Sequence, residues 1–256
     1  MSTEVILKWE SPIARVQFRE GRGIHILSAD VRQRLHDVLA EIEQLADCRI
    51  VVFEATGRTF IAGAQIKEFL DLNIGTAEQL AKDGQKLMQR IEDLAPITLA
   101  AVQGATAGGG CELALACDQR IAATSVRIGL PEVTLGLIPG WGGCVRAVRL
   151  LGEPAAKRLI LSGELVPAET ALSLGLVDAV VPDAEFPQAV ETRIKQLLAG
   201  GPLACRAAKR LMRELRSPTS AADYDREAAA FARCFTTDEP AEGSSAFLEK
   251  RPAKWR

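Results

Sequence analysis

The sequence has very little histidine and no paired cysteine motif, and these absences argue against two common kinds of site. Among its 256 residues there are only two histidines, His25 and His36, and they lack the spacing of metal ligands. The six cysteines are scattered, and none belongs to a CxxC pair. Cysteines used in this way in a chain of this size indicate reduced thiols. We therefore expect no metal centre and a cytoplasmic protein.

The sequence also lacks an excess of charge and a long apolar run. Its 31 Lys and Arg residues nearly balance its 33 Asp and Glu residues, so the net charge is −2. Nucleic-acid binding requires clustered Lys and Arg, and no nucleic-acid partner is expected. We also expect no membrane span and no secretory signal, because no apolar stretch has the required length or flanks. Hydrophobic residues are plentiful, at 48%, and suffice for a sizeable core. The length of 256 residues predicts one large domain or a domain with a small appendage.

Apolar periodicity predicts an α/β protein. Helices are expected after Ser28 and over residues 76–94, where apolar residues recur at helical spacing. Two short strands are expected over residues 5–7 and 14–18, a buried strand over residues 49–54 and a central strand over residues 97–102. A strand, a glycine turn and a helix in succession indicate a parallel layer. Further helices are expected over residues 185–199, 203–216, 221–235 and 239–249.

The residues most suited to catalysis are concentrated between Gln103 and Gly143. The glycine run Gly108–Gly110 precedes an apolar segment that carries Glu112, so a loop is expected to turn into a buried helix. Unpaired N–H groups at a helix start suit an oxygen that gains negative charge. A carboxyl group in apolar surroundings has a raised pKa and can hold a proton near neutral pH. A single Glu in this position is more often an ordinary helix-start residue, and it is the second acid, Glu132, that favours a catalytic pair.

Three segments resemble the signature sequences of the enoyl-CoA hydratase/isomerase (crotonase) superfamily, and most closely its two-glutamate hydratases. They are GGGCELALACD with LPEVTLGLIPGWGG in the stretch above, GRTFIAGAQIKEFL at Gly57–Leu70, and EGSSAFLEKRPAKW at Glu242–Trp255. Their order and separations match as well as their letters, and the resemblance covers nearly the whole chain. It implies an α/β fold of the ClpP/crotonase type, a spiral of repeated ββα units with a C-terminal helical region.

The resemblance also implies which groups bind the substrate, an acyl-CoA thioester. The backbone N–H groups of Ala62 and Gly109 are expected to form an oxyanion hole for the thioester carbonyl. The full set expected to contact the substrate or its CoA part is Ala62, Gly63, Ala64, Gln65, Gly109, Phe247 and Lys250. The family usually has Asp where Gln65 stands, and we expect this change to adjust a cap or a loop. No separate cofactor is implied, because coenzyme A is part of the substrate.

The two carboxyl groups decide which reaction the resemblance implies. Glu132 is expected to activate a water molecule as the base, and Glu112 to position that water and act as the acid. The reaction would be the reversible addition of water to a 2-enoyl-CoA, giving a 3-hydroxyacyl-CoA, in fatty-acid or related acyl-CoA degradation. The alternatives are a double-bond isomerase, a hydratase for a cyclic or branched dienoyl-CoA, and a non-enzymatic binding protein. A serine-nucleophile hydrolase is disfavoured, because neither histidine has a matching partner motif.

The C-terminal part is expected to serve assembly. Residues 1–195 would form the spiral core with the site, and residues 196–256 a helical region for trimerisation. By resemblance the protein is a homotrimer or a homohexamer built as a dimer of trimers. Phe247 and Lys250 match family positions near the adenine end of CoA, although the basic C-terminal residues would equally suit a solvated tail.

Overall fold

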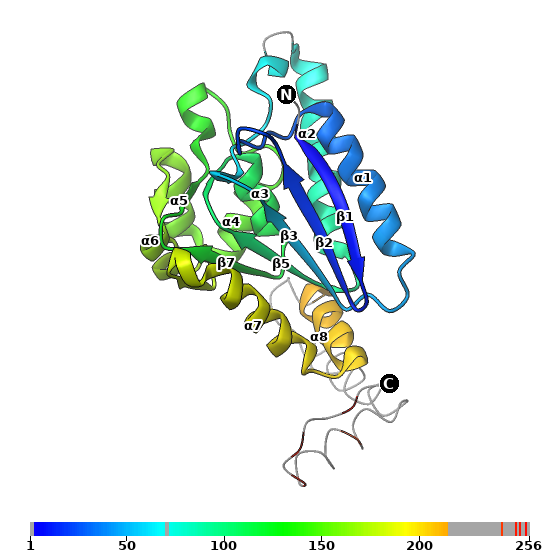
Figure 1. Cartoon of the computed structure of the whole chain (residues 1–256). Coiled ribbons are helices and arrows are strands. Elements are labelled where there is room, and N and C mark those ends of the chain that lie inside the picture. The colour runs from blue at the N-terminus through cyan, green and yellow to red at the C-terminus, as the bar shows by residue number, and fades with distance from the viewer. Residues whose placement is uncertain are drawn as a thin grey trace, which may run out of the picture.

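The computed structural model describes residues 3–69, 72–214, 242, 249, 251 and 254. Two β-sheets with surrounding helices make up the architecture (Figure 1). The larger sheet has the order β1-β2-β3-β5-β7-β10, with the bounds Glu4–Glu10, Ile13–Arg19, Ile50–Ala55, Ile97–Val102, Gln119–Ala123 and Ala179–Val181. The smaller sheet has the order β4-β6-β8-β9, with the bounds Thr59–Ile61, Ala105–Ala107, Arg127–Gly129 and Val166–Pro167.

Helices connect and cover these strands. The α-helices α1 to α8 span Ala29–Glu43, Ile74–Asp93, Gly109–Ala116, Gly143–Leu151, Glu153–Ser162, Ala168–Leu174, Phe186–Leu198 and Pro202–Glu214. Three short 3-10 helices, η1 to η3, span Ile66–Phe69, Pro131–Leu135 and Asp183–Glu185. The helices predicted within residues 221–249 lie outside the described residues.

The chain alternates between the two sheets, and this alternation produces the predicted ββα repeat. The strands β3, β5 and β7 of the larger sheet are each followed by a strand of the smaller sheet, namely β4, β6 and β8, and then by a helical segment. From β2 to β10 neighbouring strands of the larger sheet pair in parallel. Parallel strands require crossover connections, and here each crossover from β3 to β5 and from β5 to β7 includes a strand of the second sheet.

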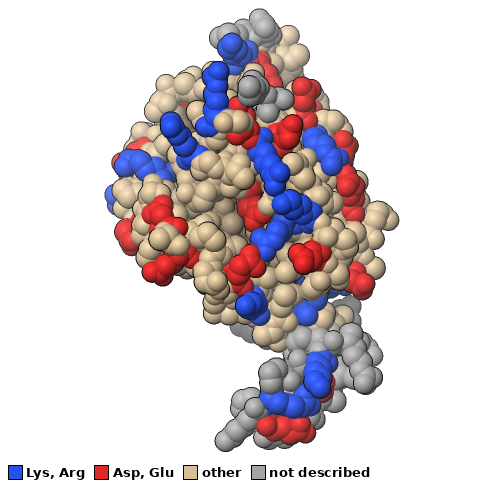
Figure 2. Space-filling model, in the orientation of Figure 1, with Lys and Arg blue, Asp and Glu red and all other residues tan. Residues whose placement is uncertain are grey.

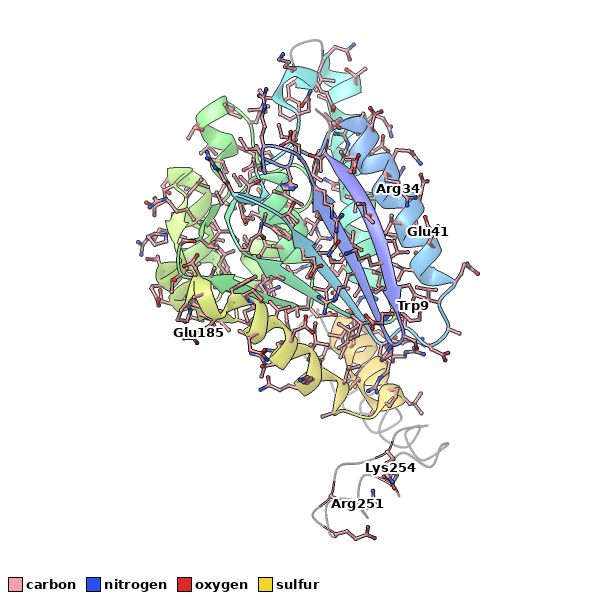
Figure 3. The ribbon with its side chains drawn as sticks, viewed as in Figure 1. Trp9, Arg34, Glu41, Glu185, Arg251 and Lys254 are labelled. Atoms are coloured by element: carbon pink, nitrogen blue, oxygen red, sulfur yellow. The ribbon has the colours of Figure 1, made fainter. Side chains whose placement is uncertain are left out.

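The core is formed by the central strands and by the helices packed against them. Residues Ile50 to Phe53 of β3 are fully buried, as expected for a parallel strand covered on both faces. On α1 the buried residues fall at the predicted helical spacing; they are Val31, Leu35, Val38, Leu39 and Ile42. The outer face of the same helix carries Arg34 and Glu41, which form an ion pair at 2.8 Å (Figure 3). The amphipathic pattern of the sequence therefore sets which side of α1 faces the sheet.

The last described helices pack against the strands of the larger sheet. Helix α7 contacts β3 and β7, and α8 contacts β5. Buried Lys209 of α8 donates to the Pro96 carbonyl at 2.8 Å and pairs with Asp118 at 2.6 Å, which fixes α8 below the sheet. On the face drawn in Figure 2, Lys and Arg side chains alternate with Asp and Glu.

Two further findings concern the described part of the chain. Within residues 3–69 and 72–214 no helix combines the length and the apolarity that a membrane span requires. In the same ranges no three His, Cys, Asp or Glu side chains gather as metal ligands would.

Candidate active site

The turn into α3 forms one wall of the site, and glycine is required there for two reasons. Gly108 caps the helix with φ +51°, in the region that residues with a side chain rarely adopt. A Cβ on Gly108 would also lie 2.9 Å from Oε1 of Glu132. On the other side of the helix, a Cβ on Gly110 would overlap the Ile61 carbonyl oxygen, so α3 packs directly on β4. The glycine run therefore brings the helix start against both a strand and a carboxyl group.

Glu112 stands in the first turn of α3 and is almost completely buried, at 2% exposure. Its Oε1 accepts hydrogen bonds from Trp141 N at 2.7 Å and Gly143 N at 2.9 Å. Burial, followed by the charge of Glu132, raises the pKa of Glu112 to about 7, against the opposing effect of the two N–H donors. A carboxyl group with this pKa can hold or release a proton near neutral pH.

Glu132 lies in η2, directly after Pro131, and its carboxyl group faces the start of α3. Its Oε2 is buried and has no hydrogen-bond partner among the residues that the structure describes. Burial raises the pKa of Glu132 to about 7. The structure thus brings together the two acids that the sequence singled out, at the wall of one cavity. Glu112 has its Oε1 fixed by main-chain donors, and Glu132 has an oxygen without a partner in the described part of the chain.

A glycine turn and one arginine hold the donors that orient Glu112. Arg146 of α4 is 6% exposed; it donates to the Trp141 carbonyl at 3.1 Å and pairs with Glu92 of α2 at 2.8 Å. A Cβ on Gly142, which has φ +103°, would collide with the Arg146 guanidinium. The ion pair between Arg146 and Glu92 therefore ties the turn at Trp141, which precedes α4, to helix α2. Sequence reasoning missed Arg146, because its partner is 54 residues away.

Replacing Arg146 with methionine is expected to lower kcat for the reaction proposed below about tenfold, with a smaller change in KM. The reason is that the turn loses its fixed position and Glu112 its orientation when the ion pair between Arg146 and Glu92 is removed. Steady-state kinetics measures the effect, and Arg146→Lys should restore part of kcat. The control is Arg149→Met, because Arg149 lies three residues further along α4 and is exposed. A variant that unfolds at lower temperature but keeps kcat would limit Arg146 to a structural role.

The main-chain donors differ in one respect from the prediction. The N–H of Ala62 donates to the His25 carbonyl at 2.8 Å, so the assignment of this N–H to an oxyanion hole is wrong. The reason is that the loop before α1 pairs with the segment after β4: His25 N donates to Thr59 Oγ1 and Leu27 N to the Gly63 carbonyl. Sequence alone gives no sign of this pairing between distant segments.

Two other N–H groups remain available at the site. The N–H groups of Ala64 and Gly109 have no acceptor among the described residues. For Gly109 this follows from its place as the first residue of α3, where no acceptor exists one turn earlier. Ala64 lies two residues beyond Ala62, past Gly63, whose φ of +128° turns the chain. Both residues line the cavity that holds the two acids.

This cavity has a volume of about 480 Å³ and lies between α2, α3, η1 and the segment around Trp141. Its polar wall contains most of the predicted site residues, namely Ala62, Gly63, Ala64, Gly109, Glu112 and Glu132. Gln65 does not line it; the Gln65 carbonyl accepts from Glu68 N at the start of η1. Phe247 and Lys250 lie outside the described residues. Apart from the two glutamates, the described lining carries no charged side chain, which suits an apolar ligand with one polar end.

Trp141 is buried between helices and also lines the cavity. Its ring lies against Gly84 of α2 on one side and against Gly109 of α3 on the other, where added Cβ atoms would be 2.1 Å and 2.7 Å from ring atoms. The guanidinium of Arg32 lies 5.4 Å from the ring centroid, within the range of a cation–π contact. Trp141 therefore spaces α2 from α3 and so sets the width of the cavity.

Comparison with known proteins agrees with this architecture. The family model described as enoyl-CoA hydratase/isomerase matches residues 8–256. The short-chain-enoyl-CoA hydratase of Clostridium acetobutylicum is 34% identical, over 96% of this chain and 95% of its own length. The crotonyl-CoA hydratase of Syntrophomonas wolfei is 35% identical, over 98% of this chain and 97% of its own length. The crystal structure of the enoyl-CoA hydratase from Bacillus anthracis superposes with a TM-score of 0.91 at 32% identity, covering 98% of each chain.

Buried Glu112 and half-buried Glu132 lie beside main-chain donors that have no acceptor among the described residues, an arrangement suited to acid–base chemistry. The chain belongs to the enoyl-CoA hydratase/isomerase family. The predicted family and the predicted crotonase-like fold are both confirmed.

Proposed function

We propose that this protein is an enoyl-CoA hydratase, which adds water reversibly to the 2,3 double bond of a 2-enoyl-CoA to give a 3-hydroxyacyl-CoA. The observation that carries the proposal is the pair of glutamates, buried Glu112 and half-buried Glu132, in a largely apolar cavity. The same cavity presents two main-chain N–H groups that have no acceptor among the described residues. The names of its relatives from Clostridium acetobutylicum and Syntrophomonas wolfei support the same reaction. Degradation of fatty acids or related acyl groups is the pathway class that uses it.

The main-chain donors would bind the thioester carbonyl. With Ala62 N engaged by His25, the proposed oxyanion hole consists of Ala64 N and Gly109 N. Negative charge develops on the carbonyl oxygen as water adds at C3, and donors already in place stabilise that charge without reorganisation. One such donor contributes about 3 kcal/mol to lowering a barrier.

The two carboxyl groups would divide the acid–base work. Ionised Glu132 takes a proton from the water as its oxygen bonds to C3, and the double-bond electrons move onto the thioester carbonyl. Protonated Glu112 then delivers a proton to C2 as the carbonyl is restored, so one water is consumed and no charge is left over. Its Oε1 accepts the two N–H groups, which leaves Oε2 to carry the proton and position the water. Exchange of one proton between the acids completes the cycle, and no separate cofactor is needed.

The assignment is tested by following the loss of the enoyl-thioester absorbance of crotonyl-CoA in the presence of the protein. Formation of 3-hydroxybutyryl-CoA, identified by chromatography, is the expected result. The same assay with a 3-enoyl-CoA separates hydration from isomerisation. Conversion of the 3-enoyl thioester alone, without hydration of crotonyl-CoA, would replace the proposal with a double-bond isomerase.

The pH dependence of kcat/KM is expected to be bell-shaped with a maximum near pH 7. The pKa values of both Glu112 and Glu132 are raised to about 7, and the active form holds one proton between the two acids. As pH falls the base becomes protonated, and as pH rises the acid loses its proton, so the rate falls on both sides. Rates measured from about pH 5 to about pH 9 at constant ionic strength check this prediction. A flat profile over that range would contradict it.

We further propose assembly as a homotrimer or homohexamer in the cytoplasm, with the core in residues 1–195 and the assembly region in residues 196–256. Several large apolar side chains exposed on α4, α5, α6 and α8 support an interface; they are Val145, Val148, Leu150, Leu161, Leu172 and Met212. The free thiols of Cys48, Cys111, Cys117 and Cys144 suit a reducing compartment. Phe247 and Lys250 are proposed to contact the adenine end of CoA. Light scattering on the purified protein measures the number of subunits.

A further inference from the structure

Arg32 is a largely buried cation that takes no part in the proposed acid–base steps. It lies in the first turn of α1, and its side chain is only 13% exposed. It is not among the described residues that line the cavity. Its guanidinium nevertheless contacts three different segments, and each of these segments carries or supports a group of the site.

The first contact reaches the segment before α1. Arg32 Nη1 donates to the Leu27 carbonyl at 2.8 Å. Leu27 forms a parallel β-bridge with Ala64, and its N–H donates to the Gly63 carbonyl at 2.9 Å. Its buried side chain lies beside the other donor residue, since a Cβ added to Gly109 would be 3.5 Å from Leu27 Cδ1. Leu27 therefore contacts both donor residues, and Arg32 holds Leu27 from α1.

The second contact fastens the segment that follows the Ala64 donor. Arg32 Nη2 donates to Glu68 Oε2 at 2.9 Å, and Glu68 Oε1 accepts from Ala29 N at 2.9 Å. Both oxygens of Glu68 are thus engaged by the first turn of α1, where the helix dipole favours a carboxylate. Glu68 lies in η1, four residues after Ala64. The ion pair therefore limits how far the Ala64 N–H can move.

The third contact is with the ring of Trp141. The guanidinium carbon of Arg32 lies 5.4 Å from the ring centroid, a distance at which the ring attracts a cation. The same ring packs on Gly109, and the main-chain N–H of Trp141 donates to Glu112 Oε1 at 2.7 Å. A shift of the ring would therefore disturb the donor at Gly109 and the carboxyl group of Glu112 together.

Arginine is suited to making these three contacts at once. Its guanidinium is planar, always charged, and carries several N–H donors in fixed directions. Two of these directions serve Leu27 and Glu68, and the charge lies near the ring of Trp141. A lysine ammonium would keep the charge but would not fix the spacing of the two hydrogen bonds.

We infer that Arg32 is a positioning residue that fixes the separation of the two main-chain donors, Ala64 N and Gly109 N. Through Trp141 it also fixes the orientation of Glu112. The inference rests on the proposed function, because it takes the thioester carbonyl to accept hydrogen bonds from these two donors.

The infrared stretching frequency of a bound thioester carbonyl tests the inference without depending on turnover. The probe is butyryl-CoA labelled with carbon-13 at the thioester carbonyl, which has no double bond to hydrate. In the wild-type protein the two donors should lower this frequency relative to the free ligand. Arg32→Met removes the charge and the N–H donors, and the frequency should return about half-way to the free value as the donors lose their spacing.

The same substitution should lower kcat for crotonyl-CoA by about tenfold to a hundredfold, with a smaller change in KM. Full loss of one such donor costs about 10²–10³-fold, and a displaced donor costs less. Arg32→Lys should restore part of kcat and part of the frequency shift. Glu68→Gln, whose amide oxygen can still accept from Ala29 N, should move the frequency in the same direction by a smaller amount.

Arg34→Met is the matched control, because Arg34 is on the same helix, has a side chain that is 43% exposed and pairs with Glu41 at 2.8 Å (Figure 3). It should leave kcat and the carbonyl frequency at their wild-type values. Melting temperatures of all the variants are measured in parallel.

A wild-type carbonyl frequency in both Arg32→Met and Glu68→Gln would overturn the inference, and a lowered melting temperature would then limit Arg32 to a structural role. A wild-type protein that binds butyryl-CoA without lowering the frequency would refute the proposed donors, and the inference with them. A lowered frequency that depends on Arg32, in a protein that does not hydrate crotonyl-CoA, would uphold the inference while refuting the proposed reaction.

Discussion

Replacing Glu132 with glutamine is expected to lower kcat for hydration by about a thousandfold. Glutamine keeps the size and shape of the side chain but cannot take a proton from water, and general base catalysis contributes typically 10²–10⁴-fold. The buried Oε2 of Glu132, which has no partner among the described residues, is the atom whose basicity is lost. Steady-state hydration of a 2-enoyl-CoA measures the effect.

Binding should survive this substitution, because Glu132 is not needed to hold the thioester. The Kd for a saturated acyl-CoA is expected to stay within a few-fold of the wild-type value, which shows that the cavity is intact. Glu41→Gln, on the outer face of α1, is the matched control and should hydrate at the wild-type rate (Figure 3). Turnover by Glu132→Gln at close to the wild-type rate would remove this residue from the mechanism.

Replacing Glu112 with glutamine is expected to be nearly as severe, with a loss of about a hundredfold to a thousandfold. The amide oxygen of glutamine can still accept the hydrogen bonds of Trp141 N and Gly143 N, so the turn should keep its shape. What is lost is the proton that, in the proposed mechanism, Glu112 with its pKa of about 7 delivers to C2. The effect should therefore appear in kcat rather than in KM.

The double variant Glu112→Gln/Glu132→Gln distinguishes a shared water from two independent contributions. If both acids serve one water and one proton, removing the second after the first costs little, and the double variant should be about as slow as the slower single variant. Rates of all four proteins under the same conditions complete the cycle. A loss in the double variant equal to the product of the two single losses would refute the shared-water mechanism.

Part of the fold could be read from local pattern. The helices α1 and α2 were predicted from apolar residues at a period of 3.6, and the strands β1, β2, β3 and β5 from short runs rich in apolar residues. The strands β4, β6 and β8 have three residues each, too few for an alternation to be visible. The second sheet of the spiral was therefore predicted only through the family resemblance.

The site divides in the same way. Glycine spacing and the two acids, Glu112 and Glu132, were found in the sequence because close backbone approach and buried acid–base chemistry require these residue types. The donor assignment failed at Ala62, since its N–H is bonded to a loop 37 residues earlier. The bond between Arg146 and Glu92 was equally invisible, because ion pairing of this kind depends on how two helices meet.

The sequence by itself determined the family, the two acids and the glycine-lined helix start, because these depend on residue type at short spacing. Only the tertiary structure decided which main-chain N–H groups of the site are left without an acceptor among the described residues, that both carboxyl groups have a pKa raised to about 7, and that both acids line one cavity. The physical reason is that hydrogen-bond pairing, desolvation and cavity shape all arise between segments far apart in the chain, and no local pattern encodes them.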